Sequence, residues 1–270
     1  MPRSGRTRAP NWASYSDVAD AYERYHVQRG YALLARDLVL ALELLNGAIV
    51  LDVGTGTGAA ALIALHRSPR TVIGLDPSLP MLGIAAKKGL KLTVAGEAPG
   101  LPFAAERFDA VMASLVLSHF PNYQDALADI VRVLKPGGKL GLTAWAASDS
   151  EFARQWRCIA ELFVGAEELW KAAQYHPWEN WFTDPEHVAS ALTGARLKEV
   201  RLEERKYRVL IAAAEYLSRM ESSLIGRWMS HAMDSSRWEE FRRTAAEHFA
   251  HRFPSSFTIL ARANLAIATK

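Results

Sequence analysis

Between residues 48 and 145, short β-rich runs alternate with segments of helix-forming residues, and this alternation constrains the fold more than any other feature. The β-rich runs lie at residues 48–53, 71–75, 92–95, 108–113 and 139–145. Parallel neighbouring strands need a crossover connection, which is normally a helix. The sequence therefore predicts an α/β protein with a doubly wound, mostly parallel sheet, in which ligands bind at the carboxyl ends of the strands.

The segments outside this range supply further helices and two more strands. Helical patterns occur at residues 12–25 and 31–45, before the first strand, and again at 151–171 and 212–249. Residues 197–209 and 256–268 alternate like strands. Because strands resume at the C-terminus, we expect all seven to belong to one sheet and residues 1–270 to form a single domain.

Composition and charge exclude several classes of protein. Half of the 270 residues are hydrophobic and 23% are charged, which is enough to bury a core. A single cysteine, Cys158, rules out a disulfide framework or a cysteine-based zinc site. The net charge of +3 is carried by Arg3, Arg6 and Arg8 in residues 1–10, which we predict to be a disordered tail. We therefore expect no nucleic-acid partner, no membrane contact and a cytoplasmic location.

A glycine-rich loop follows the first strand and leads into a helix. Gly54, Gly56 and Gly58, with the alanine that follows, formally match a dinucleotide-binding fingerprint, and Asp76 lies at the distance of its ribose-binding acid. A nicotinamide-dependent oxidoreductase is therefore one candidate. Asp52, two residues before the first glycine, disfavours a pyrophosphate and favours a ligand that carries an ammonium group. S-adenosylmethionine has an ammonium group, a sulfonium and no phosphate.

Five stretches resemble, in the same order, the motifs of one enzyme family. They are the loop 51–58, Gly74–Ser78 with Met81, Gly96–Ala98 with Leu101–Phe103, Phe108–Val111, and Arg132–Leu140. The chain thereby resembles a class I S-adenosylmethionine-dependent methyltransferase, of the group that includes the ubiquinone- and menaquinone-biosynthesis enzymes. This resemblance implies a Rossmann-like methyltransferase fold and S-adenosyl-L-methionine as cofactor, with S-adenosyl-L-homocysteine as product.

The resemblance also implies which residues bind that cofactor. Asp52 and the loop would hold the methionyl end, Asp76 the ribose hydroxyls, and Glu97 and Ala98 the adenine. The family more often has aspartate in place of Glu97. The remaining members of the implied set, besides Asp52, Asp76, Glu97 and Ala98, are Tyr15, Tyr22, Gly54, Thr55, Gly56, Gly58, Pro77, Met81 and Ser114. For the two tyrosines, ordinary packing of an amphipathic helix is an equal alternative.

Methyl transfer needs alignment, exclusion of water and, for a hydroxyl acceptor, removal of a proton. His119, after the fourth strand, is the candidate base, although a histidine that only shapes the pocket is the alternative. The expected substrate pocket combines Trp145 with His176, Trp178, Trp181 and Phe182. Two alternatives are that the aromatic loop carrying the last four residues attaches the segment after the fifth strand to the sheet, or that it contacts another subunit. Metal-ligating residues do not cluster, so no metal is expected.

The leading interpretation is methyl transfer to a small, apolar or aromatic metabolite through oxygen, carbon or nitrogen, with a homodimer as one option. A methyltransferase-like protein that catalyses another reaction, such as a cyclisation, is the alternative. Within the single domain we expect a helical lid at 11–46 and a cofactor-binding core at 47–146. Residues 147–183 and 212–255 are expected to form a cap, and 184–211 with 256–270 to complete the sheet.

Overall fold

The computed structural model describes residues 14–67 and 69–270, and the basic tail at residues 1–10 lies outside this range. Its seven strands form one sheet in the order β3-β2-β1-β4-β5-β7-β6, and only β7 runs antiparallel to its neighbours. The strands are β1 (Ile49–Val53), β2 (Thr71–Asp76), β3 (Thr93–Ala95), β4 (Phe108–Ser114), β5 (Leu134–Trp145), β6 (Lys198–Ala212) and β7 (Ser256–Thr269). The predicted fold class is confirmed.

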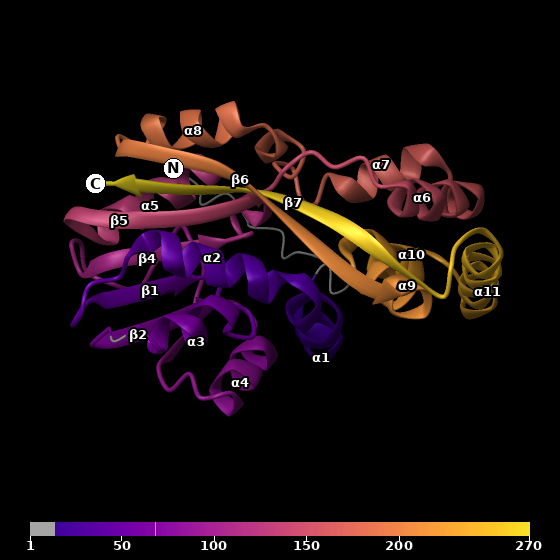
Figure 1. Ribbon diagram of the computed structural model, residues 1–270, viewed down its shortest axis with the longest axis horizontal. Helices are drawn as coiled ribbons and strands as arrows, with labels where there is room; N and C mark the ends of the chain where they lie inside the picture. Colours follow the sequence, from indigo (N-terminus) through magenta and orange to yellow (C-terminus); the bar gives the residue numbers. More distant parts are fainter. Residues whose placement is uncertain (1–13, 68) are drawn as a thin grey trace, which may run out of the picture.

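Helices cover both faces of this sheet, which explains why most residues of the central strands β1 and β4 are buried. Successive side chains of a strand point to opposite faces, so Val50 packs with one hydrophobic cluster and Leu51 with the other. The cluster around Val50 includes α2 (Ala32–Leu42), α3 (Ala59–Leu65) and α4 (Leu79–Lys87). The cluster around Leu51 includes α5 (Tyr123–Val133) and α8 (Pro185–Gly194). Figure 1 shows the sheet between these two layers.

The last two strands extend beyond the rest of the sheet. β5 pairs with β7 only from Ala263 to Thr269, whereas the first half of β7 pairs with β6 alone. This part of the antiparallel pair β6–β7 carries a separate group of helices, which we call the cap (Figure 1). The cap helices are α6 (Glu151–Val164), α7 (Ala166–Ala173), α9 (Ala213–Glu221), α10 (Leu224–Ala232) and α11 (Ser235–Arg252). Their apolar side chains form a third hydrophobic core together with residues of β6 and β7.

Two helices predicted as continuous are interrupted, so those predictions were wrong in extent. Gly165 has a φ of +82°, a left-handed conformation that ends α6 and separates it from α7. The predicted helix 212–249 is divided into α9, α10 and α11, because Ser223 and Asp234 each cap a new helix with a side-chain oxygen. The breaks give the cap its folded-back shape.

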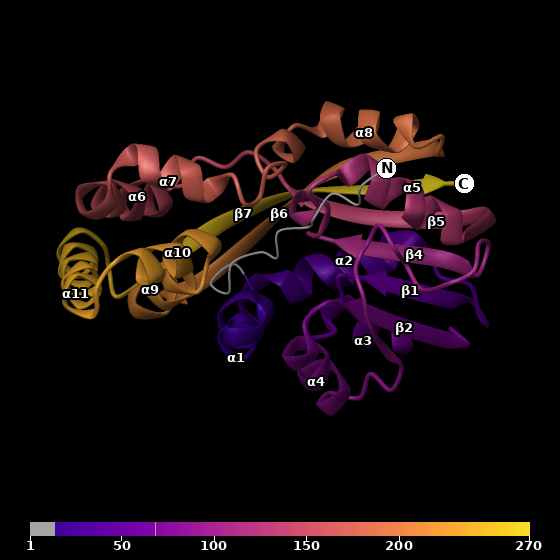
Figure 2. The same cartoon turned by 180° about the vertical axis from the view of Figure 1, so that it is seen from behind.

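The segment before α2 forms a lid between the sheet and the cap. It consists of a 3-10 turn (η2, Ser16–Val18), one helical turn (α1, Ala19–Tyr22) and a π-helix (η3, Glu23–Tyr31). Figure 2 shows from behind that α1 lies beside the carboxyl-terminal side of the sheet, next to the cap helices. The lid therefore faces the edge at which doubly wound sheets bind their ligands.

Candidate active site

The glycine loop between β1 and α3 is a tight turn that only glycine fits well. Gly54, Gly56 and Gly58 have φ values of +68°, +54° and +85°, in the left-handed region that side chains disfavour. A Cβ atom added to Gly54 would also lie 2.4 Å from Cγ2 of Val116. The loop is closed by a hydrogen bond of 2.9 Å from the Thr55 N–H to the Leu75 carbonyl, which ties it to β2.

Two buried carboxylates hold this loop in place. Asp52, 1% exposed, accepts hydrogen bonds from the Thr55 hydroxyl at 2.7 Å and from the Ala61 N–H at 3.1 Å. Asp76, 9% exposed, accepts from the N–H groups of Gly56 and Ser78, each at 2.9 Å. Burial raises the pKa of Asp76 above its ordinary value and that of Asp52 from 3.8 to about 7. Both acids therefore lie at the loop, and Asp52 is bonded within it.

The other residues implied as cofactor contacts lie around the same strand ends. Met81 is buried in α4, while Pro77 at the start of that helix is exposed. Glu97 is exposed and Ala98 is buried in the turn after β3. The Ser114 hydroxyl, at the end of β4, lies 3.0 Å from the Thr143 hydroxyl of β5.

The lid is attached to the glycine loop by polar contacts that we call the latch. Glu23 of η3 accepts a hydrogen bond from the Thr57 hydroxyl and forms an ion pair of 2.8 Å with Lys88, which follows α4. Burial raises the pKa of Glu23, but the hydrogen bonds from Lys88 and Thr57 outweigh it and lower the pKa overall. Nearby, the hydroxyls of Ser16 and Ser78 are 3.0 Å apart. The latch therefore connects the lid, the loop and α4.

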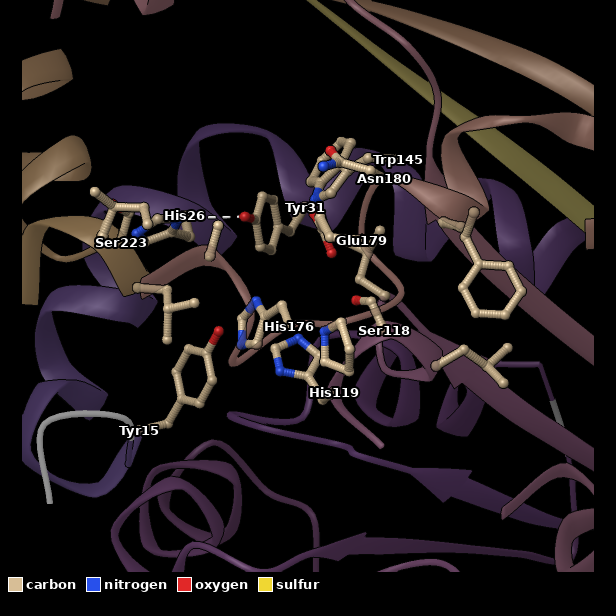
Figure 3. A pocket seen from close by; sticks show the side chains of 18 of the residues that line it. Tyr15, His26, Tyr31, Ser118, His119, Trp145, His176, Glu179, Asn180 and Ser223 are labelled. Carbon is tan, nitrogen blue, oxygen red and sulfur yellow. Dashed lines mark hydrogen bonds between the residues drawn. The ribbon is translucent and has the colours of Figure 1, made fainter. Parts of the chain in front are cut away.

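A cavity of about 360 Å³ lies between the lid, the ends of β4 and β5, the segment 173–182 and the junction of α9 and α10. Tyr15 and Tyr22 of the lid line it, and a Cβ atom on Gly56 would lie 3.8 Å from the Tyr22 ring. Tyr22 thus separates the cavity from the glycine loop. Figure 3 shows Tyr15, Tyr31 and Trp145 around the space that contains His119 and His176.

His119 and His176 lie side by side in this cavity, with ring centres 4.0 Å apart (Figure 3). Burial, together with the positive charge of Arg227, lowers the pKa of His119 to about 4. Burial, His119 and Arg227 lower the pKa of His176 to about 2. His119 also donates to the Leu115 backbone carbonyl, which leaves its second ring nitrogen as an acceptor. Both imidazoles are therefore neutral near pH 7.

Of the residues predicted for the substrate pocket, Trp145, His176 and Phe182 line the cavity, whereas Trp178 and Trp181 do not. The Trp178 ring packs against Tyr123 with centres 4.8 Å apart, and its N–H donates to the Pro121 carbonyl. Trp181 is 43% exposed and stacks on His187. Placing these two tryptophans in the pocket was thus a misassignment, because they serve to attach the loop to its neighbours.

Several residues of the cavity were missed at the level of the sequence. His26 and Tyr31 come from η3, Ser222 from the α9–α10 junction, and Ser118 and Glu179 from the two loops that carry the histidines. His26 Nε2 lies 2.9 Å from the Ser222 hydroxyl, and its Nδ1 lies 3.3 Å from the Tyr31 hydroxyl. Glu179 was visible inside the aromatic loop, but nothing in the linear sequence distinguishes it from a surface acid.

The conserved domain model "Methyltransferase domain" matches residues 51–142, from the glycine loop to β5. This stretch contains the two acids and the loop that they hold. Residues 51–142 therefore form a methyltransferase domain. The predicted family is thereby confirmed, and the cofactor of this methyltransferase domain is S-adenosylmethionine.

Curated relatives of the methyltransferase domain match it over part of their length. The demethylmenaquinone methyltransferase of Thermus thermophilus is 41% identical over 97 residues, which is 34% of this chain and 44% of that protein. The demethylmenaquinone methyltransferase of Thermobifida fusca is 36% identical over 141 residues, or 47% of this chain and 58% of that protein. The chain thus spans about half of the length of these relatives.

A solved structure matches almost the whole chain. Phosphoethanolamine N-methyltransferase 2 of Haemonchus contortus, in complex with S-adenosyl-L-methionine, has a TM-score of 0.58 at 16% identity and covers 98% of this chain and 58% of its own. At this identity the likeness concerns the fold alone.

Within the described residues, no group of three or more histidine, cysteine or acidic side chains is arranged to hold a metal ion. No helix in the same range has the length and hydrophobicity needed to cross a bilayer.

Proposed function

We propose that this protein transfers the methyl group of S-adenosylmethionine to a small-molecule acceptor bound in the cavity between lid, sheet and cap. The observation that carries the proposal is the position of this cavity at the ends of β4 and β5, beside the glycine loop, with Tyr22 contacting both. Its volume of about 360 Å³ is suited to a small metabolite. A cavity of this size argues against a polymer such as nucleic acid as the acceptor.

The residues around the glycine loop fit the cofactor. Each oxygen of Asp76 accepts one backbone N–H, so each has a lone pair left for a ribose hydroxyl. Gly54 and Gly56 carry no side chain, which lets a ligand approach the backbone closely. When bound, S-adenosylmethionine supplies an electrophilic methyl group on its sulfonium. Asp52, Asp76 and the loop would orient it, and Tyr22 with the rest of the lid would exclude water.

His119 is the proposed proton acceptor. It lines the cavity, is neutral near pH 7, and has one ring nitrogen bonded to the Leu115 carbonyl and the other available. A neutral imidazole takes up the proton that a hydroxyl acceptor releases as its oxygen is methylated. His176, whose ring centre lies 4.0 Å from that of His119, restricts how this imidazole can turn.

We do not infer that this protein methylates the same acceptor as its curated relatives. Most cavity residues, such as Tyr31, His176 and Ser222, lie outside the matched residues 51–142. These segments lie outside the matched domain, and in this proposal they determine which acceptor fits the cavity. We also propose that the acceptor is small, that the protein is cytoplasmic and that it forms a homodimer. Light scattering after size-exclusion chromatography tests the homodimer.

Cofactor binding tests the first part of the proposal. S-adenosylhomocysteine and S-adenosylmethionine are expected to raise the unfolding midpoint, because each binds the folded state, and NAD is expected to leave it unchanged. Stabilisation by NAD alone would overturn the assignment. Methyl-labelled cofactor is then incubated with a panel of small acceptors. Tight cofactor binding without label transfer to any of them would favour the alternative, a non-methylating reaction such as a cyclisation.

The role of His119 is tested with the acceptor identified in this way. The substitution His119→Ala removes the proton acceptor, so kcat is expected to fall by about 100-fold or more. The dissociation constant of S-adenosylhomocysteine should stay within about twofold, and His251→Ala, at an exposed site of α11, serves as control. Because the pKa of His119 is about 4, the wild-type kcat should not decline between pH 8 and 6 through this group. An unchanged kcat in the variant would remove His119 as base.

A further inference from the structure

One carboxylate lines the cavity. Among the described residues that form its wall, Glu179 is the acidic one, and no lysine or arginine is among them. Figure 3 shows Glu179 near Tyr31, Trp145, Asn180 and Ser118. The rings of Tyr31 and Trp145 lie against each other, with centres 5.1 Å apart. We call this group of five residues the Glu179 niche.

The charge of Glu179 has no cationic partner within the described protein. No ion pair of the described residues includes it, and its side chain accepts a hydrogen bond from the Ser118 hydroxyl. Burial raises the pKa of the Glu179 carboxyl above its ordinary value. A buried carboxylate is costly unless a cation or several hydrogen bonds compensate it. A positively charged ligand group in the cavity would provide that compensation.

Two arginines lie near the cavity without lining it. The Arg227 guanidinium carbon lies 4.4 Å from the centre of the Tyr15 ring, and that of Arg219 lies 5.6 Å from the centre of the Tyr31 ring. Each contacts a tyrosine of the wall from outside the cavity. The charge of Arg227 helps to keep His119 neutral, and neither arginine is among the residues of the cavity wall.

We propose that the methyl acceptor carries a protonated amine, which binds in the Glu179 niche. The carboxylate of Glu179 accepts hydrogen bonds from the ammonium group, and the electron-rich rings of Tyr31 and Trp145 attract its charge. The amide oxygen of Asn180 adds a further acceptor. This inference rests on the proposed function, because it assumes that the cavity holds the acceptor. The amine is here the group that is recognised, and the methyl group goes to whichever nucleophile faces His119.

Matched ligands test the proposal by binding alone. Isothermal titration of the protein saturated with S-adenosylhomocysteine would compare 2-phenylethylamine and tryptamine with their alcohol counterparts, 2-phenylethanol and tryptophol. At least one amine is expected to bind about tenfold or more tightly than its alcohol, because a charge-assisted hydrogen bond is lost in the alcohol. Equal affinities within both pairs, or no binding of either amine, would overturn the proposal.

The variant Glu179→Gln keeps the shape of the niche and removes its charge. It is expected to lower the affinity of the preferred amine by about tenfold or more, and to leave the affinities of the alcohol and of S-adenosylhomocysteine within about twofold. Glu186→Gln, at an exposed position in the first turn of α8, should change none of them. An amine preference that survives in Glu179→Gln would also overturn the proposal. Amine selectivity without methyl transfer would contradict the proposed function and leave the niche in place.

Discussion

At the scale of single residues, the buried acids carry most of the site's electrostatics. Asp52 was predicted from its position before the glycines, because a carboxylate there suits an ammonium-bearing ligand. Its carboxylate is bonded inside the loop to Thr55 and Ala61, so it also supports the turn. Asp109 is the contrasting case, since it is only partly buried, accepts from the Ile49 N–H and pairs with Lys135 at 2.6 Å.

These two acids should affect the pH dependence of stability in opposite directions. Burial raises the pKa of Asp52 from 3.8 to about 7 in the folded state, so the free energy of unfolding falls as the pH rises through this window. Asp52→Asn retains an acceptor oxygen and removes the charge. Relative to wild type, its free energy of unfolding should be unchanged near pH 4 and should gain up to about 4 kcal/mol by pH 8, measured in urea without cofactor.

The control for this prediction is Asp109→Asn. Burial raises the pKa of Asp109, but its bonds with Lys135 and Ile49 lower the pKa overall. This acid therefore stabilises the fold above its unfolded pKa, and the variant should be slightly less stable than wild type at pH 8. Identical pH profiles for Asp52→Asn and wild type would contradict the assignment. The affinity of Asp52→Asn for S-adenosylhomocysteine also tests the binding role that the sequence implies.

At the scale of elements, the lid is the part that we expect to move during ligand exchange. It is joined to the loop and α4 by the latch, and to the cap by the His26–Ser222 hydrogen bond. These contacts connect three segments that are distant in the sequence. Because the Tyr22 ring lies close to Gly56, we expect a ligand at the glycine loop to leave only after the lid moves.

The substitution Lys88→Met breaks the ion pair of the latch and keeps the length of the side chain. A partly exposed pair contributes about 1 kcal/mol or less, so the dissociation rate of S-adenosylhomocysteine should rise by about two- to fivefold. Stopped-flow fluorescence measures this rate, and Lys87→Met, at the exposed neighbouring position, serves as control. Equal rates for the two variants would show that the latch does not hold the lid closed.

At the scale of the whole molecule, the cap has a hydrophobic core of its own, which packs on the outer half of the antiparallel strands β6 and β7. Its cluster includes Trp156, Met229, Phe241 and Phe249, whereas the two clusters on the sheet faces contain none of these residues. The cavity lies where this core meets the sheet, so we expect the cap to contribute to acceptor binding without taking part in the glycine loop.

Weakening the cap core should therefore separate acceptor binding from cofactor binding. Phe249 is fully buried, and Phe249→Ala is expected to cost about 3–5 kcal/mol in the cap. Hydrogen exchange should accelerate in α9, α10 and α11, with little change in β1 and β4. Cofactor affinity should persist while acceptor affinity falls. Leu210→Ala, at a 68% exposed site of β6, is the control, and equal acceleration across the molecule would contradict a separate cap.

Much of the fold and of the cofactor site could be predicted because their signals are local. Strand runs, helix caps and the glycine loop depend on neighbours within a few residues, and five motifs in order identify the family. Where a helix breaks inside an amphipathic pattern, as at Gly165 and Ser223, the capping signal was present in the sequence but the periodicity concealed it. The family resemblance therefore followed from the sequence alone, as did the alternation of strands and helices that forms a doubly wound sheet.

The tertiary structure alone added several residues to the cavity. Tyr31, Ser118, Glu179 and Ser222 come from four segments that meet only when the lid, the loop 173–182 and the cap are packed on the sheet. The burial of the cavity residues, which keeps His119 neutral and raises the pKa of Glu179, depends on that packing. The sequence by itself determined the domain and its cofactor, because these depend on short-range patterns. The features that select the acceptor arise from long-range contacts, and no local pattern encodes them.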